Sequence, residues 1–256
     1  MGNIKNGSCG FTCGNTVLTC AAVACATLLS LISTFSVYKF KKDFNSKINR
    51  WMVENPKLII DSVQKYAEKQ QAESHKRRVE ETSVNVKKHF EQIIDEKNTG
   101  VYNANGTKSI VIFFDYNCGY CKMASRALEE VTRSNKDVKI IFRDYPIFGG
   151  LSSVAAKYSV AVAMVEGKKF FDFHVALMNG NIKDEENIKS ALKEAKINVD
   201  KIKRAMKLRS DEIDKRIEEN RAIADNIGIQ GTPALIIGEE FVPGYLDAET
   251  ILDKLK

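Results

Sequence analysis

Cysteine and histidine, the residues that most often hold zinc, are scarce in this chain of 256 residues. After position 25 only Cys118 and Cys121 remain, and the whole chain has three histidines, His75, His89 and His174. A tetrahedral zinc site needs four ligands, and no second Cys or His pair has finger-like spacing. We therefore predict no bound metal, no cofactor, and histidines that are solvated or packed. The folded part also has no spare cysteine for a structural disulfide.

The chain also lacks a segment in which residues of one charge sign are concentrated. The 39 basic and 33 acidic residues give a net charge of +6, but they are interspersed along the chain. Nucleic-acid-binding proteins gather basic residues into a stripe, often with aromatic neighbours, so we expect no nucleic acid partner. With 44% hydrophobic residues the chain can bury a core, and its length suits one domain of about 150 to 180 residues plus accessory segments.

One long stretch near the N-terminus has no charge at all. Residues 15–38 contain no Asp, Glu, Lys or Arg, and an apolar run of this length crosses a bilayer as one helix. We predict that residues 1–39 form a membrane anchor or signal-anchor, with residues 16–38 inside the membrane. The run is longer than the apolar part of a typical signal peptide, which favours its retention.

Cleavage of this segment is the alternative. Ala22, Val23 and Ala24 precede Cys25 and faintly resemble a lipoprotein processing site, although the usual large aliphatic residue is missing. The four N-terminal cysteines are open to acylation or pairing, but in so apolar a segment we expect them to be packing residues. They are Cys9, Cys13, Cys20 and Cys25.

Residues 40–83 are predicted to form a helical oligomerisation stalk and linker. Asn55-Pro56 marks a helix start between two apolar clusters, and residues 67–78 are polar on every face, as is typical of a linker. Apolar helix faces outside the main domain need a partner surface, and a second copy of the chain supplies one most simply. We therefore expect a homo-oligomer; the alternative is that these helices fold back on their own domain. The clusters are Phe40, Phe44, Ile48, Trp51 and Met52, then Leu58, Ile59, Val63 and Tyr66.

A β-α-β unit is predicted around the two isolated cysteines. The apolar run 109–114 follows the turn signal Asn105-Gly106 and predicts a buried strand. Cys118 then opens a helix that extends to about Arg133, and residues 138–142 form a second buried strand. Both cysteines therefore lie at the N-terminus of the first helix.

The remaining segments place this unit in an α/β fold. Residues 150–226 show helical patterns closed by glycine-containing turns, which predicts a helical insertion. Residues 234–237 and 240–242 are predicted strands, and a last helix covers 247–256 with Asp247 as its N-cap.

The cysteine pair carries the predicted chemistry. Unpaired N–H groups and the helix dipole stabilise a thiolate at a helix N-terminus and lower its pKa. We predict that Cys118 attacks and that Cys121, one turn inside the helix, resolves the mixed disulfide. The alternative is a structural disulfide, but closing a loop with two intervening residues stabilises a fold little.

Four segments resemble the DsbA-type oxidoreductases. The resemblance covers about residues 84–256, and the combination of Cys-x-x-Cys with a later Thr-Pro is specific, although either alone would be weak. It implies a thioredoxin-like fold with an inserted helical domain, preceded here by the stalk and one transmembrane helix. The segments are FFDYNCGYCK at 113–122, DYP at 144–146, FFDFHVALM at 170–178 and GIQGTPALIIG at 228–238.

The resemblance also implies site residues outside the cysteine pair. Pro233 would be a cis-proline that faces the cysteines, and Thr232 would offer its backbone to an extended substrate peptide as an added strand. Gly119 and Tyr120 are expected to contact substrate. They replace the Pro-His of the family's strong oxidants, so no imidazole between the cysteines stabilises the thiolate.

Two positions concern the proton of the resolving thiol. Many family members have a buried acid six residues before the first cysteine, where this chain has Ile112. Proton transfer would then pass through water or Asp115. We expect Asp115 to be a solvated loop residue at the strand end and assign it no catalytic role.

The Cys-Gly-Tyr-Cys sequence indicates the direction of the chemistry. Together with threonine before the proline, it resembles dimeric disulfide isomerases, trimeric DsbA relatives linked to copper resistance, and membrane or surface members of the family. The resemblance implies a disulfide isomerase for exported proteins, as a homo-oligomer with a trimer favoured and with an unknown membrane redox partner. The alternatives are a DsbA-type dithiol oxidase and a Cu(I)-sequestering thiol protein. A vestigial scaffold is a third, against which the intact cysteine pair and Pro233 argue.

Charge and redox chemistry disagree about the orientation of the anchor. More basic residues follow the apolar run than precede it, so the positive-inside rule places the C-terminal side in the cytoplasm. A reactive dithiol suits an oxidising compartment. Because charge bias is statistical, we predict a bacterial inner-membrane anchor with the catalytic domain in the periplasm; a secreted or lipoprotein form is the alternative. The basic residues are Lys39, Lys41, Lys42, Lys47 and Arg50 after the run and Lys5 before it.

Overall fold

The computed structural model describes residues 13–97 and 99–256, with side chains from residue 22 onward. The chain divides into two compact units, Met1–Gln71 and Ala72–Lys256. The second unit holds both Cys118 and Cys121, and it begins 12 residues before the domain boundary expected at residue 84.

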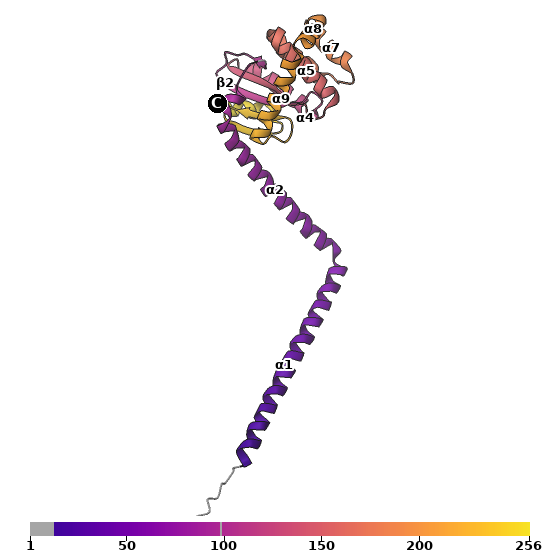
Figure 1. Cartoon of the computed structure of the whole chain (residues 1–256), viewed down its shortest axis with the longest axis vertical. Coiled ribbons are helices and arrows are strands. Elements are labelled where there is room, and N and C mark those ends of the chain that lie inside the picture. The colour runs from indigo at the N-terminus through magenta and orange to yellow at the C-terminus, as the bar shows by residue number, and fades with distance from the viewer. Residues whose placement is uncertain (1–12, 98) are drawn as a thin grey trace, which may run out of the picture. The chain divides into compact units, whose positions relative to one another are not determined.

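Two long helices make up the N-terminal part (Figure 1). Helix α1 spans Cys13–Glu54. Its segment Ala22–Glu54 contains an 18-residue window with a mean hydropathy of 1.5, long and apolar enough to cross a membrane. Helix α2 spans Pro56–Lys88 and begins at the predicted proline. Asn55 separates the helices, and its N–H and side-chain amide both donate to the Trp51 carbonyl, at 2.9 and 2.8 Å. A proline as first helical residue is expected here, because that position needs no N–H donor.

The polar segment 67–78 is helical, as part of α2, and not a break between helices. Its residues are mainly Ala, Glu, Lys, Gln and Arg, which are among the strongest helix formers. An ion pair four residues apart, Lys76 with Glu80 at 3.9 Å, adds a little support on the exposed face. Helix propensity therefore maintains a helix where no apolar face exists to pack.

The second unit is built on a five-stranded sheet with the order β1-β3-β2-β4-β5. The strands β2 and β3 are parallel, and every other pair is antiparallel. Strand β2 is central and entirely apolar after its first two residues, as a strand covered on both faces must be. The strands are β1 Gly100–Tyr102, β2 Lys108–Phe114, β3 Val138–Asp144, β4 Ala234–Ile237 and β5 Glu240–Pro243.

Helices cover both faces of this sheet. One face packs against α4 and α10 and against the inserted helices, and the other packs against the end of α2, α3 and the last turns of α9. In Figure 1 the inserted α7 and α8 lie at the end of the unit away from β4 and β5, which are yellow. The helices are α3 Phe90–Ile93, α4 Gly119–Ser134, α5 Gly150–Glu166, η1 Gly167–Lys169, α6 Phe170–Asn179, α7 Glu185–Glu194, α8 Val199–Leu208, α9 Ser210–Ile227 and α10 Ala248–Lys254.

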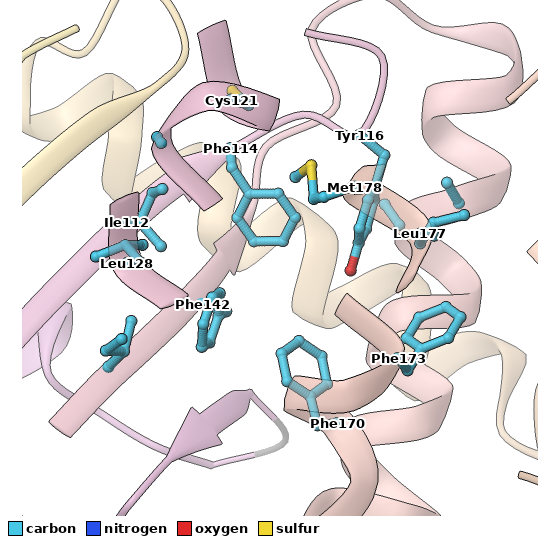
Figure 2. Packing of buried hydrophobic residues seen from close by; sticks show 14 of the residues in the cluster. Ile112, Phe114, Tyr116, Cys121, Leu128, Phe142, Phe170, Phe173, Leu177 and Met178 are labelled. Carbon is cyan, nitrogen blue, oxygen red and sulfur yellow. The ribbon is translucent and has the colours of Figure 1, made fainter. Parts of the chain in front are cut away.

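Aromatic packing fixes the end of β2, from which the cysteine loop departs. The Phe114 ring contacts Tyr116 and His174 edge-on, at centroid distances of 5.0 and 4.9 Å. Figure 2 shows the ring of Phe114 among Ile112 and Leu128 on one side and Tyr116 and Met178 on the other. Buried aromatic pairs of this kind stabilise beyond the area that they bury, so the loop starts from a rigid base.

A buried arginine fastens the segment after α2 to the other face. Arg143 of β3 is completely buried, and its guanidinium donates to the carbonyls of Gln92, Ile93 and Asp95 and to the Asn220 side chain, at 2.6–3.2 Å. Burial and the neighbouring Arg216 lower its pKa to about 10, so the group is still charged at neutral pH. Charge-assisted hydrogen bonds of this number hold residues 92–95 against the sheet.

Candidate functional site

Cys118 caps the N-terminus of α4. Its backbone is extended, with φ −79° and ψ 120°, and its N–H donates to the Asp115 carbonyl at 3.1 Å. The Cys118 Sγ accepts a hydrogen bond from the Cys121 N–H at 3.4 Å. The predicted position at the start of the helix is therefore observed, and the sulfur occupies the place that a capping oxygen usually takes.

The loop before β4 lies against this sulfur. The Thr232–Pro233 peptide bond is cis, as predicted. The Cys118 Sγ lies 3.2 Å from the Thr232 carbonyl oxygen, to which it donates when it is protonated. The Pro233 carbonyl is held by the Gly244 N–H at 2.9 Å. The hydroxyl of Thr232 is buried and has no hydrogen-bond partner of regular geometry among the described residues. Segments more than 110 positions apart thus meet at one thiol.

The two cysteines have opposite acidities. The Cys121 side chain, the Thr232 side chain and the N–H groups of Cys121 and Tyr120 lower the pKa of Cys118 to about 6, although partial burial opposes them. Cys121 is completely buried, and burial, followed by the neighbouring Cys118, raises its pKa. At neutral pH the pair therefore holds one thiolate, on Cys118, and one protonated thiol, on Cys121.

The residues between the cysteines lie on an exposed turn. Gly119 begins α4, and a Cβ built there meets no atom within 4 Å. Tyr120 is 65% exposed, and Phe148, from the loop after β3, is 63% exposed. Met123 and Ile147 are also exposed. Large apolar side chains that remain in solvent next to a reactive group are typical of an interaction surface.

Asp115 is buried, contrary to the prediction that it is a solvated loop residue. It is 1% exposed, and its carboxylate accepts from the Asn117 N–H at 2.8 Å and from the Phe148 N–H at 3.1 Å. Two backbone donors satisfy a carboxylate that would otherwise need water. Asp115 thereby joins the cysteine loop to the loop after β3, and the second donor lies too far along the sequence to be anticipated.

A second buried carboxyl group lies on β3, the strand that pairs with β2, where Ile112 is located. Asp144 ends β3 opposite Phe114 and is 3% exposed. It accepts from the Ser159 hydroxyl at 3.0 Å, and Ser159 accepts from the Tyr116 hydroxyl at 3.1 Å. Tyr116 Oη also lies 3.3 Å from His174 Nδ1. In Figure 2 the Tyr116 hydroxyl points away from Cys121.

Burial disfavours the charged forms of the two titratable groups at the ends of this hydrogen-bonded chain of side chains. Burial raises the pKa of Asp144 well above its usual range, and burial lowers the pKa of His174 to about 3. The Asp144 Oδ1 and His174 Nε2 atoms have no partner among the described residues. Asp144 and His174 lie in two of the segments that resemble the family, at 144–146 and 170–178, but no local pattern indicates that the fold joins them.

Fold and site together define a thioredoxin-like dithiol protein: a Cys-x-x-Cys pair opens the first helix of a β-α-β unit, opposite a cis-proline. The sequence profile of the DSBA-like thioredoxin domain matches residues 109–256. The chain belongs to this family, and the predicted fold class is confirmed. It is a thiol-disulfide oxidoreductase of the DsbA type.

Solved structures agree with this assignment. The thiol-disulfide exchange protein alpha-DsbA2 from Wolbachia pipientis is 32% identical, with 70% of this chain and 96% of that chain covered and a TM-score of 0.64. The catalytic domain of Proteus mirabilis ScsC is 26% identical, covering 68% and 98%, with a TM-score of 0.58. A periplasmic thioredoxin-like protein from Salmonella enterica serovar Typhimurium is 26% identical, covering 64% and 91%, with a TM-score of 0.57. No curated protein sequence matches the chain.

Proposed function

We propose that this oxidoreductase is a disulfide isomerase for exported proteins, with Cys118 as nucleophile and Cys121 as resolving thiol. The unequal acidity of the two thiols carries the proposal. Thr232, Pro233, Gly119 and Tyr120 surround Cys118 and bind the substrate polypeptide.

The first step is attack on a substrate disulfide. The Cys118 thiolate forms a bond to one substrate sulfur, the substrate S–S bond breaks, and its electron pair leaves on the second substrate sulfur as a thiolate. That thiolate attacks another disulfide of the same substrate. A further substrate thiolate then attacks the mixed disulfide and releases Cys118 unchanged, so isomerisation has no net oxidation.

Cys121 releases the substrate from a mixed disulfide with Cys118 that has not rearranged. It must lose its proton before it attacks the Cys118 sulfur, which oxidises the pair and leaves the substrate reduced by two electrons. Burial is the main cause of its raised pKa and persists when Cys118 is in a mixed disulfide. A slow resolving step gives the substrate sulfurs time to rearrange, which supports isomerase over reductase work.

A dithiol oxidase is the second candidate. The pKa of about 6 at Cys118 stabilises the reduced form, and stabilisation of the reduced form makes a disulfide a stronger oxidant. The two functions differ in whether the pair is reduced or oxidised when it meets its substrate.

The N-terminal part serves, in this proposal, to anchor and assemble the enzyme. Residues 1–39 form the anchor, 40–83 the stalk and linker, and 84–256 the catalytic domain, which lies in the periplasm. Large exposed apolar side chains along α1 and α2 support a homo-oligomer, with a trimer favoured. They include Phe40, Phe44, Trp51, Val53, Leu58, Ile60, Val63 and Tyr66.

Refolding of scrambled ribonuclease by the full chain in detergent tests the proposal. We expect ribonuclease activity to return with the wild type, and to be lost with Cys118→Ala. Deleting residues 40–71 removes the exposed apolar part of the stalk but keeps the part of α2 that packs on the catalytic unit. This variant should lose isomerase activity and keep reactivity toward a small disulfide. Oxidation of reduced ribonuclease without recovery from the scrambled form would instead identify an oxidase.

A further inference from the structure

A pocket of about 270 Å³ lies in the catalytic unit between α2 and the Thr232–Pro233 loop. His75, Arg78, Val79 and Thr82 of α2 line one side. These positions follow the spacing of one helical face, whereas Arg77 lies off that face. The opposite side is the segment 228–233, which includes Thr232, whose carbonyl contacts Cys118. The pocket therefore shares Thr232 and Pro233 with the candidate reaction site.

The backbone of this second side is available for pairing. The backbone groups of Gln230 and Gly231 make no hydrogen bond to any described residue, and neither residue is buried. A Cβ built on Gly231 meets no atom within 4 Å, so the space beside the segment is open. An extended polypeptide adds to such a segment by main-chain hydrogen bonds.

The charges at the pocket have one sign. Arg78 and His75 are the lining residues with basic side chains, no described lining residue is acidic, and neither side chain forms an ion pair or hydrogen bond with a described residue. An arginine is always charged at physiological pH, and its planar donors match a carboxylate. The volume suits one or two side chains and is below the range of a pocket for a whole small molecule.

We propose that this pocket binds residues next to the reactive cysteine of an extended polypeptide substrate and prefers a carboxylate side chain, which faces Arg78 and His75. The inference rests on thiol-disulfide exchange at Cys118, as proposed above. It makes the end of α2 part of the substrate site, so that the helix contributes to specificity as well as to the connection with the anchor.

Two peptides that differ only in charge test the proposal. Each has one cysteine, disulfide-bonded to a coloured aromatic thiol and flanked on both sides by either Glu or Lys. Attack by Cys118 on the peptide sulfur forms the mixed disulfide and releases the coloured thiol. At low ionic strength, the full-length wild type should react about threefold faster with the Glu peptide, the range of an exposed ion pair.

Charge reversal at one position provides the specific control. Arg78→Glu should reverse the preference, so that the Lys peptide reacts faster, whereas Arg77→Glu changes the net charge equally and should keep the wild-type preference. Equal effects of the two variants would indicate general steering by net charge and would overturn the proposal, as would no effect of Arg78→Glu.

The uncharged 2-hydroxyethyl disulfide separates this proposal from the proposed function. Cys118-dependent reaction with it, together with an unchanged charge preference in Arg78→Glu, would leave the exchange function intact and refute the subsite. No Cys118-dependent reaction with any of the three disulfides would overturn both.

Discussion

The backbone N–H of Cys121 donates a hydrogen bond to the Sγ of Cys118 at 3.4 Å. The same helical turn buries the Cys121 side chain while it leaves the Cys118 sulfur at the end of the helix. One local geometry therefore lowers the pKa of the Cys118 thiol and raises the pKa of the Cys121 thiol. Such an arrangement needs no histidine between the cysteines.

The rate at which Cys118 is alkylated should depend on pH with a midpoint below that of an ordinary cysteine. Because its pKa is lowered to about 6, the rate with iodoacetamide should rise up to about pH 6 and level off above pH 7, where a free cysteine still reacts slowly. Mass spectrometry of the Cys118 peptide separates this site from the N-terminal cysteines. A midpoint above pH 8 would show that the helix N-terminus does not stabilise the thiolate.

Asp144→Asn should become more stable relative to the wild type as the pH rises. Burial raises the pKa of Asp144, so the folded protein retains a proton that the unfolded chain releases above about pH 4. The contribution of Asp144 to the free energy of unfolding is thus complete at low pH and declines as the pH rises. Urea unfolding at pH 4, 6 and 8 measures the difference.

Asp144→Ala distinguishes the hydrogen bond from the charge. This variant also cannot ionise, but it leaves the buried Ser159 hydroxyl without its acceptor. It should be less stable than Asp144→Asn by about 1–3 kcal/mol at every pH. A free-energy difference between Asp144→Asn and wild type that does not change with pH would contradict the raised pKa of Asp144.

Arg143→Met should destabilise the catalytic unit by about 3 kcal/mol or more. The substitution leaves the buried carbonyl of Ile93 and the Asn220 side chain without their donor, and each unsatisfied buried group costs about 1–3 kcal/mol. Arg126→Met is the matched control, because Arg126 is exposed and bonds only to Asn179 among the described residues. It should change stability by about 0.5 kcal/mol or less, and equal losses in both variants would refute the role of Arg143.

The parts of the fold that the sequence predicts are those encoded by local patterns. Strand β2 is predicted from its apolar run, and the helix at Cys118 and the Asp247 cap are predicted from their neighbours; the Asp247 side chain accepts from the Thr250 N–H at 2.8 Å. Strand β1 was missed, because three residues are too few to show an alternation.

The other features of the structure that differ from the prediction, or that no local pattern predicts, have several causes. Asp115 has the sequence of a solvated turn, and its buried carboxylate is satisfied by the local Asn117 N–H together with the distant Phe148 N–H. The polar segment 67–78 has no apolar period, yet it is helical, because its residues are mainly strong helix formers. The cis bond at Pro233 was predicted from the resemblance to a family, and no local pattern indicates it.

Trapping of the mixed disulfide tests the central claim most directly. In a full-length chain whose four N-terminal cysteines are replaced by alanine, Cys121→Ala should accumulate a covalent complex with scrambled ribonuclease, joined through Cys118 and released by dithiothreitol. Cys118→Ala should form none, because the remaining Cys121 is buried and its pKa is raised. A complex of equal yield on Cys118→Ala, or no complex on Cys121→Ala, would contradict the assignment of Cys118 as the attacking thiolate.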